Sequence, residues 1–162
     1  QGSSIGMTVV QREPQLAAAI ELAFSFDSRV LAEEYIKGRE FTVAILEDKS
    51  LPVIEIIPKN PFFDFEAKYK PGMTEYVVPA VVEPDRAAQM QQIALKAHQL
   101  LGCSGCSRVD FMFSPERGPV VLEVNTIPGL TATSLLPKAA KMAGIEFGEL
   151  CLKLLNLAYE KK

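Results

Sequence analysis

Hydrophobic positions along the chain fall into segments of helical or strand period that are separated by turns. Apolar residues at helical spacing predict helices over residues 14–24, 85–101, 134–143 and 147–159. Short apolar or alternating runs predict strands over residues 31–35, 40–46, 52–57, 76–80, 107–113 and 119–125. The first three strands are closely spaced, and we expect them to pair as antiparallel neighbours.

Between residues 58 and 76 the pattern loses its period and becomes a mixture of polar and aromatic residues. Long structureless stretches inside compact domains are uncommon and are usually lids, binding loops or disordered segments. The alternative is that residues 58–76 form a surface loop without a function.

Length and charge narrow the class of protein. The chain has 162 residues, which suits one domain, or one and a fragment of another, at roughly 150 residues per domain. Its 17 basic and 20 acidic residues give a net charge of −3, and no basic run forms the stripe typical of a nucleic-acid binder. No apolar run reaches the roughly 20 residues of a membrane span. We therefore expect a soluble, cytoplasmic protein with neither nucleic acid nor membrane as a partner.

Three cysteines, at positions 103, 106 and 151, are an odd number and indicate reduced thiols. Cys103 and Cys106 form a C-x-x-C pair, which could be a redox pair or half of a zinc site. No second cysteine pair follows and the lone His98 is distant, so we interpret the pair as packing residues. His98 is interpreted as a solvated or locally bonded side chain.

The chain opens on a glycine-serine segment with no initiator methionine, so we expect it to be a piece of a longer protein. Residues 2–6 could cradle a phosphate. That signal is weak by itself, because the segment has neither a Walker lysine nor the dinucleotide-binding spacing.

The chemistry concentrates in the two predicted strands at 107–113 and 119–125. Because alternate side chains of a strand share a face, Arg108 and Asp110 share one face of the first, and Glu123 and Asn125 share one face of the second. The intervening apolar residues are expected on the core side: Val109, Phe111, Phe113, Val120, Leu122 and Val124. If the connection closes a hairpin, both polar sets look out from the same side of the sheet.

The two carboxylates, which lie side by side with an amide and an arginine nearby, repel one another unless a cation or a charge network lies between them. Mg²⁺ prefers such hard oxygen ligands and usually takes one or two carboxylates together with phosphates and waters. Asp110, Glu123 and Asn125 therefore suggest a metal-nucleotide site, with a solvated polar face as the alternative. Residues 126–134 then form a loop that places the N-terminus of the next helix beside the proposed metal. A helix N-terminus attracts carboxylate or phosphate groups.

Five segments, taken in order, closely resemble the D-alanine-D-alanine ligase family. They are residues 2–7, 33–43, 65–69, 108–110 and 122–131. The resemblance implies an α+β ATP-grasp fold, with a mostly antiparallel sheet and flanking helices, truncated at the N-terminus. It also implies a reaction in which ATP phosphorylates one D-alanine, and the amine of a second attacks the acyl phosphate to give the dipeptide used in peptidoglycan.

The implied cofactors are ATP and two Mg²⁺ ions, with Mn²⁺ as a substitute, and the implied partners are two D-alanine molecules. A homodimer is expected of the full-length protein. Tyr69 favours an amine as acceptor, since the related D-alanine-D-lactate ligases carry histidine after the lysine of that motif. Another ATP-grasp carboxylate-amine ligase, with D-serine or D-lactate as acceptor, and a non-catalytic nucleotide-binding module remain as alternatives.

The resemblance also assigns roles to residues at the reacting groups. Asp110, Glu123 and Asn125 correspond to the Mg²⁺ ligands, with Glu123 bridging two ions. Arg108 and the backbone of Gly129 correspond to the groups that stabilise the developing oxyanion. Substrate-binding positions are matched by Ser3, Asn125, Gly129, Ser134 and Leu135.

The nucleotide positions lie mostly earlier in the chain. Ser4 matches the loop over the phosphates, and the adenine hinge is matched by Glu33, Glu34, Tyr35 and Ile36. Glu40 is similar to the acid that bonds the ribose, and Lys68 to the phosphate-binding lysine of a mobile loop.

In this interpretation residues 1–57 include the glycine-serine loop and the hinge, 58–76 form a mobile lid, and 77–162 form the metal- and substrate-binding lobe. The family's N-terminal domain and the two ATP-binding lysines that precede the loop are not in this sequence. The chain alone is expected to bind nucleotide weakly and to be catalytically inactive.

Overall fold

The computed structural model describes residues 4–59 and 72–159, which belong to two compact units. One unit comprises residues 1–36 and 58–75, and the other comprises residues 37–57 and 76–162. The segment that follows the predicted adenine hinge, up to residue 57, therefore lies in the same unit as the predicted metal-binding strands.

The first unit contains a short 3-10 helix, Glu13–Gln15, followed by α1, Leu16–Phe24. Pro14 falls within the first turn, where its missing N–H costs no hydrogen bond, so the predicted helix at 14–24 is confirmed. The strand predicted at 31–35 is wrong, since this segment forms no ladder. Leu31 is 79% exposed and Tyr35 is 56% exposed, so the segment gains neither the burial nor the cross-strand pairing that stabilises a strand.

The second unit is built on an antiparallel sheet. Within the described residues six strands form this sheet, in the order β4-β3-β1-β5-β6, with β2 paired to β1. Their bounds are β1 Arg39–Leu46, β2 Lys49–Ser50, β3 Ile54–Pro58, β4 Thr74–Val77, β5 Cys106–Ser114 and β6 Gly118–Asn125. The antiparallel pairing of the early strands is confirmed for β1 and β3. The strand predicted at 76–80 begins two residues earlier and ends at Val77.

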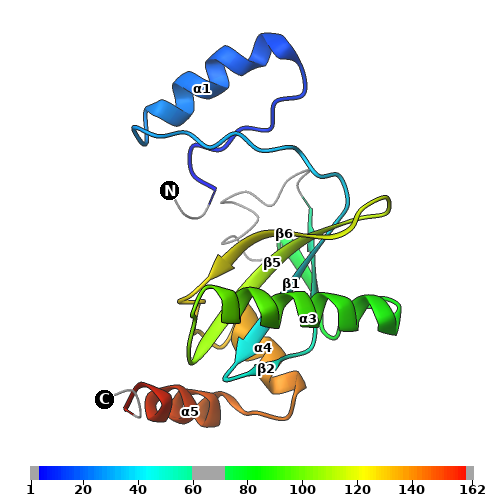
Figure 1. Ribbon diagram of the computed structural model, residues 1–162, viewed down its shortest axis with the longest axis vertical. Coiled ribbons are helices and arrows are strands. Elements are labelled where there is room, and N and C mark those ends of the chain that lie inside the picture. The colour runs from blue at the N-terminus through cyan, green and yellow to red at the C-terminus, as the bar shows by residue number, and fades with distance from the viewer. Residues whose placement is uncertain (1–3, 60–71, 160–162) are drawn as a thin grey trace. The chain divides into compact units, whose positions relative to one another are not determined.

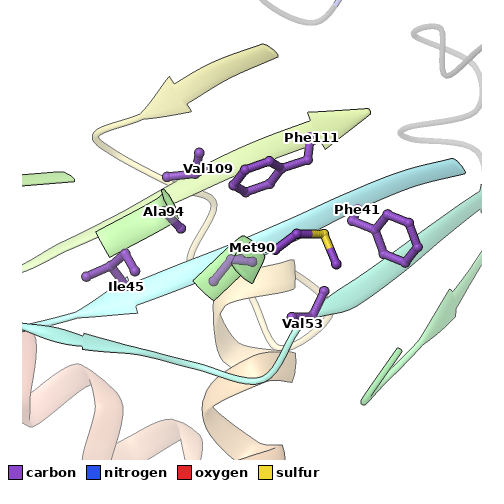
Figure 2. Packing of buried hydrophobic residues seen from close by; sticks show 8 residues of the cluster. Phe41, Ile45, Val53, Met90, Ala94, Val109 and Phe111 are labelled. Carbon is purple, nitrogen blue, oxygen red and sulfur yellow. The ribbon is translucent and has the colours of Figure 1, made fainter. Parts of the chain in front are cut away.

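Helices cover both faces of the sheet, α3 in front and α4 behind in Figure 1. Their bounds are α3 Pro84–Leu100, α4 Leu135–Met142 and α5 Phe147–Tyr159, close to the predicted ranges. Met90 and Ala94 of α3 pack against the buried side chains of β1 and β5 (Figure 2). The opposite face of β1 is also buried, at Thr42 and Ala44. In the described ranges no helix is both long enough and apolar enough to cross a bilayer.

His98 belongs to the buried face of α3 and is not solvated. It is 2% exposed, and its Nδ1 lies 2.7 Å from the hydroxyl of Ser107 on β5. Burial lowers the pKa of His98. The spacing of Met90, Ala94 and His98, four residues apart, places all three on one helix face, so the sequence carried a signal for this position.

Gly38 permits the close approach of the chain to β5 at the start of β1. A Cβ atom at this position would lie about 2.1 Å from the carbonyl oxygen of Phe113. That oxygen is backbone in a paired strand, since Arg39 is in register with Phe113, so it has little freedom to move. Gly38→Ala is therefore expected to lower the free energy of unfolding by about 1–3 kcal/mol, as overpacking does, measured by urea denaturation.

Gly148 provides the matched control, because a Cβ there would meet nothing within 4 Å. Gly148→Ala is expected to leave the free energy of unfolding unchanged or slightly raised, since alanine favours helix. Equal urea midpoints for Gly38→Ala and the unsubstituted chain would contradict the steric account.

Candidate functional site

The hairpin of β5 and β6 brings the predicted polar residues together on one face. Arg108 lies opposite Asn125, and Asp110 lies opposite Glu123. Residues directly opposite in an antiparallel pair have neighbouring side chains on the same face. The predicted placement of these four side chains on a shared face is therefore confirmed.

A β-bulge follows directly after this cluster. The register changes from Asp110 opposite Glu123 to Phe111 opposite Val121, so Leu122 has no partner residue on β5. Leu122 is 44% exposed, and the prediction that it faces the core is wrong. Val120 lies opposite Met112, on the face of Asp110, so its predicted core position is wrong as well. One extra residue reverses the alternation of the strand, which a simple two-residue period cannot anticipate. Val124, beyond the bulge, packs against the core as predicted.

The carboxylate of Asp110 is the centre of a hydrogen-bonded network. Arg108 donates from Nε to Oδ1 at 2.9 Å and from Nη2 to Oδ2 at 2.7 Å. Asn125 donates from Nδ2 to Oδ2 at 3.0 Å. Thr42 donates from Oγ1 to Oδ1 at 2.6 Å. The amide nitrogen of Asn125 is thus engaged, and its carbonyl oxygen is the atom that could coordinate a cation.

Arg108 is surrounded by acidic groups. Burial alone would lower the pKa of Arg108, but the hydrogen bond with Asp110 and the charges of Asp110, Glu123 and Glu40 outweigh it and raise the pKa. Glu40 lies on the same face as Asp110, since β1 pairs Glu40 with Met112 and Thr42 with Asp110. The guanidinium therefore stays charged, as arginine does in proteins, and its position is fixed by a bidentate partner.

Thr42 is a site residue that the sequence analysis missed. It is 1% exposed and lies on β1 directly opposite Asp110. The sequence shows only one hydroxyl in an otherwise apolar strand. Which residue that hydroxyl bonds depends on which strand lies beside β1, and the partner, Asp110, is 68 positions away along the chain.

The loop between β6 and α4 packs tightly against Ser134, the residue directly before the helix. A Cβ atom on Gly129 would lie 2.9 Å from the Oγ of Ser134, so these two predicted residues are neighbours. The Oγ of Ser134 accepts a hydrogen bond from the N–H of Thr131 at 3.2 Å and lies 2.8 Å from the Oγ1 of Thr131. The side chain of Ser134 therefore does not cap the helix.

The start of α4 retains backbone donors. The first N–H groups of a helix have no intrahelical acceptor. Leu135 begins the helix and is buried, and since its side chain is apolar, its backbone N–H is the group that could bind a ligand. Together with the helix dipole, these donors favour a carboxylate or phosphate at this position.

The donor set fits a magnesium ion that is shared with a nucleotide. Asp110, Glu123 and Asn125 supply only carboxylate and amide oxygens on one face. Across residues 4–59 and 72–159, no group of three or more His, Cys, Asp and Glu side chains gathers that could hold a metal. A site of two carboxylates and an amide suits Mg²⁺ that takes its remaining ligands from phosphates and water.

The other predicted residues are distributed as follows. Ser4, Glu33, Glu34, Tyr35 and Ile36 lie in the first unit, where Glu33, Glu34 and Tyr35 are exposed and Ile36 is partly buried. Ser3, Lys68 and Tyr69, and with them most of the predicted lid, lie outside the described residues. Cys103, Cys106 and Cys151 are free, partly buried thiols, and burial raises the pKa of Cys106.

Solved structures define the class of protein to which this fold and site belong. The chain is similar to the D-alanine–D-alanine ligase of Bacillus anthracis, solved in complex with ATP, with a TM-score of 0.81 and 36% identity over 94% of this chain and 50% of that one. It is also similar to the VanG D-Ala:D-Ser ligase of Enterococcus faecalis, with a TM-score of 0.85 and 39% identity over 96% of this chain and 46% of that one. The fold is therefore that of the ATP-grasp ligases.

The sequence comparisons narrow this class to one family. Residues 1–156 match the family model described as D-ala D-ala ligase C-terminus. The D-alanine–D-alanine ligases of Halalkalibacterium halodurans and Geotalea uraniireducens are 49% and 48% identical over 99% and 98% of this chain. The chain belongs to the D-alanine–D-alanine ligase C-terminal family. It spans about half the length of these curated relatives, 54% and 51%.

Proposed function

We propose that this chain is the nucleotide- and metal-binding part of a D-alanine–D-alanine ligase, whose full-length form joins two D-alanine molecules at the expense of ATP for peptidoglycan synthesis. The observation that carries the proposal is the pairing of Asp110 with Glu123 and of Arg108 with Asn125 on one sheet face. This arrangement occurs in a chain whose curated relatives are D-alanine–D-alanine ligases.

Asp110, Glu123 and the carbonyl oxygen of Asn125 would hold Mg²⁺, or Mn²⁺ in its place. The ion, when bound, neutralises charge on the phosphates and on the oxygens of the transferring group. Two ions are proposed, with Glu123 shared between them. The exposure of Glu123 at the edge strand leaves room for this sharing.

Arg108 would stabilise the negative charge that develops as a nucleophile adds to the acyl group. Its guanidinium is oriented by two hydrogen bonds to Asp110, so little reorganisation is needed when the charge appears. Donors fixed in advance at a developing charge commonly contribute the largest share of catalysis. The backbone N–H of Gly129 is proposed as a second donor.

The carboxylate of the second D-alanine is proposed to bind at the start of α4, at Ser134 and the N–H of Leu135. Asn125 and Gly129 would line the same substrate. Helix N-terminal donors of this kind recognise a carboxylate by charge and hydrogen bonding together. Ser3 is proposed to help orient substrate.

Nucleotide recognition is assigned mostly to residues early in the chain. Glu40 would bond the ribose, Ser4 the phosphates, and Lys68 a phosphate from the lid at 58–76, which would exclude water from the acyl phosphate. Adenine is assigned to the hinge residues Glu33, Glu34, Tyr35 and Ile36. We further propose that the full-length protein is a cytoplasmic homodimer.

A second candidate has support from one comparison. The VanG D-Ala:D-Ser ligase is 39% identical over 96% of this chain, so an acceptor other than D-alanine is compatible with this family. Tyr69 is proposed to favour an amine over the hydroxyl of D-lactate, which leaves D-alanine and D-serine as the acceptors to distinguish.

The test uses the full-length protein with ATP and Mg²⁺ and identifies products by mass spectrometry. With D-alanine alone we expect D-alanyl-D-alanine and equimolar phosphate. With D-alanine and D-serine in equal amounts we expect the same dipeptide to predominate. A predominant D-alanyl-D-serine product would favour the second candidate, and phosphate release that does not depend on D-alanine would contradict both.

A further inference from the structure

The carboxylate of Asp110 has no spare hydrogen-bonding capacity in this structure. Two carboxylate oxygens offer about four acceptor positions. Arg108 fills two of them, Asn125 fills one and Thr42 fills one. Any ligand that takes a position on Asp110 must therefore displace one of these donors.

The three donors differ in what else they are proposed to do. Arg108 is assigned to the developing oxyanion and Asn125 to the metal and substrate, so both must engage a ligand during the reaction. Thr42 is 1% exposed and cannot reach a ligand outside the sheet. Among the described donors to Asp110, Thr42 is the one whose part in the site is confined to holding the carboxylate.

The geometry of Thr42 suits this task. Its contact with Oδ1 of Asp110 is 2.6 Å, the length of a strong hydroxyl-to-carboxylate hydrogen bond. The same hydroxyl lies 3.2 Å from the carbonyl oxygen of Val109, the residue before Asp110, so both of its acceptors belong to β5. A threonine is stiff at χ1, so its hydroxyl keeps its direction with little loss of freedom.

We propose that Thr42 is a positioning residue, which keeps Asp110 oriented on the face of the sheet so that Asp110 can bind the divalent cation. The inference rests on the proposed function, because it requires Asp110 to be a metal ligand. Hydrogen-bonding partners behind a metal ligand typically change metal affinity by about 10–100-fold when removed.

The experiment measures Mn²⁺ binding to the full-length protein with a non-hydrolysable ATP analogue, by electron paramagnetic resonance, and also the kinetic response to Mg²⁺. Thr42→Val removes the hydroxyl and keeps the shape, and Thr42→Ala is a second variant without the hydroxyl in case the first does not fold. Both are expected to raise the Kd for Mn²⁺ about 10-fold or more. Thr42→Ser, which retains the hydroxyl, is expected to restore the affinity.

Ser107→Ala is the matched control. Ser107 is also fully buried, and its hydroxyl makes a hydrogen bond of 2.7 Å. Its partner, however, is His98 of α3, which packs on the face of β5 opposite to Asp110. Its removal should leave the Kd for Mn²⁺ unchanged. In the kinetics, Thr42→Val should raise the Mg²⁺ concentration needed for half-maximal rate more than it raises the KM for D-alanine.

The other outcomes distinguish a failure of the role of Thr42 from a failure of the proposed metal site. If Asp110→Ala abolishes Mn²⁺ binding but Thr42→Val binds as the wild type does, the role of Thr42 is refuted and the proposed function stands. The role is also refuted if Ser107→Ala weakens binding as much as Thr42→Val, or if Thr42→Ser restores nothing. If Asp110→Ala binds Mn²⁺ like the wild type, the proposed metal site itself fails.

Discussion

Asp110→Ala is expected to lower D-alanine-dependent phosphate release by the full-length protein about 10³-fold. Metal coordination commonly supplies several kcal/mol of transition-state stabilisation, and a loss of about 4 kcal/mol corresponds to about 10³ in rate at about 1.36 kcal/mol per tenfold. The substitution also removes the acceptor that orients Arg108. A coupled assay of phosphate release at saturating ATP and D-alanine measures the effect.

Glu116→Gln is the control for this prediction. Glu116 is an exposed carboxylate in the turn of the same hairpin, between β5 and β6, and has no place in the site. Its rate should equal that of the wild type. A rate for Asp110→Ala that is also close to wild type would remove Asp110 from the catalytic machinery.

Arg108→Lys is expected to lower kcat by about 10²–10³, the usual cost of removing one donor at a developing oxyanion. Lysine keeps the positive charge but cannot reproduce the two parallel hydrogen bonds of the guanidinium to Asp110. Because the interaction is proposed to strengthen only in the transition state, kcat and kcat/KM for D-alanine should fall together. Steady-state kinetics at saturating Mg²⁺ and ATP measure both quantities.

The chain contains a matched control in Arg39. Arg39 forms the same bidentate pair with Glu55, with two N···O distances of 2.7 Å, but its side chain is 50% exposed and it lies outside the site. Arg39→Lys should leave kcat unchanged. If the two lysine variants lose activity equally, Arg108 acts through the stability of the sheet and not on the reacting atoms.

The hairpin was predictable because its signals are local. The alternation of polar and apolar residues in β5 places Arg108 and Asp110 on one face, and a short turn forces the next strand to run antiparallel. Glu123 and Asn125 then fall on the same face by the two-residue period. The bulge lies at Leu122, directly before Glu123 in β6, so the cluster is unaffected and the errors fall on Leu122 and Val120.

The contribution of Thr42 was not predictable, because it depends on contacts between distant parts of the chain. Residues 31–35 and β1 have similar strand signals, yet only β1 finds partners on both of its edges, β3 and β5. Once β1 is placed beside β5, the register fixes Thr42 opposite Asp110. A hydroxyl in an apolar strand indicates a buried polar partner, but not which one.

If Asp110, Glu123 and Asn125 form a divalent-cation site shared with ATP, a Mn²⁺ titration of the protein detects it. The full-length protein and its Asp110→Asn, Glu123→Gln double variant are compared by electron paramagnetic resonance in the presence of a non-hydrolysable ATP analogue. We expect a saturable signal of protein-bound Mn²⁺ in the wild type and its loss in the double variant. Superimposable titration curves for two equally well-folded proteins would contradict it.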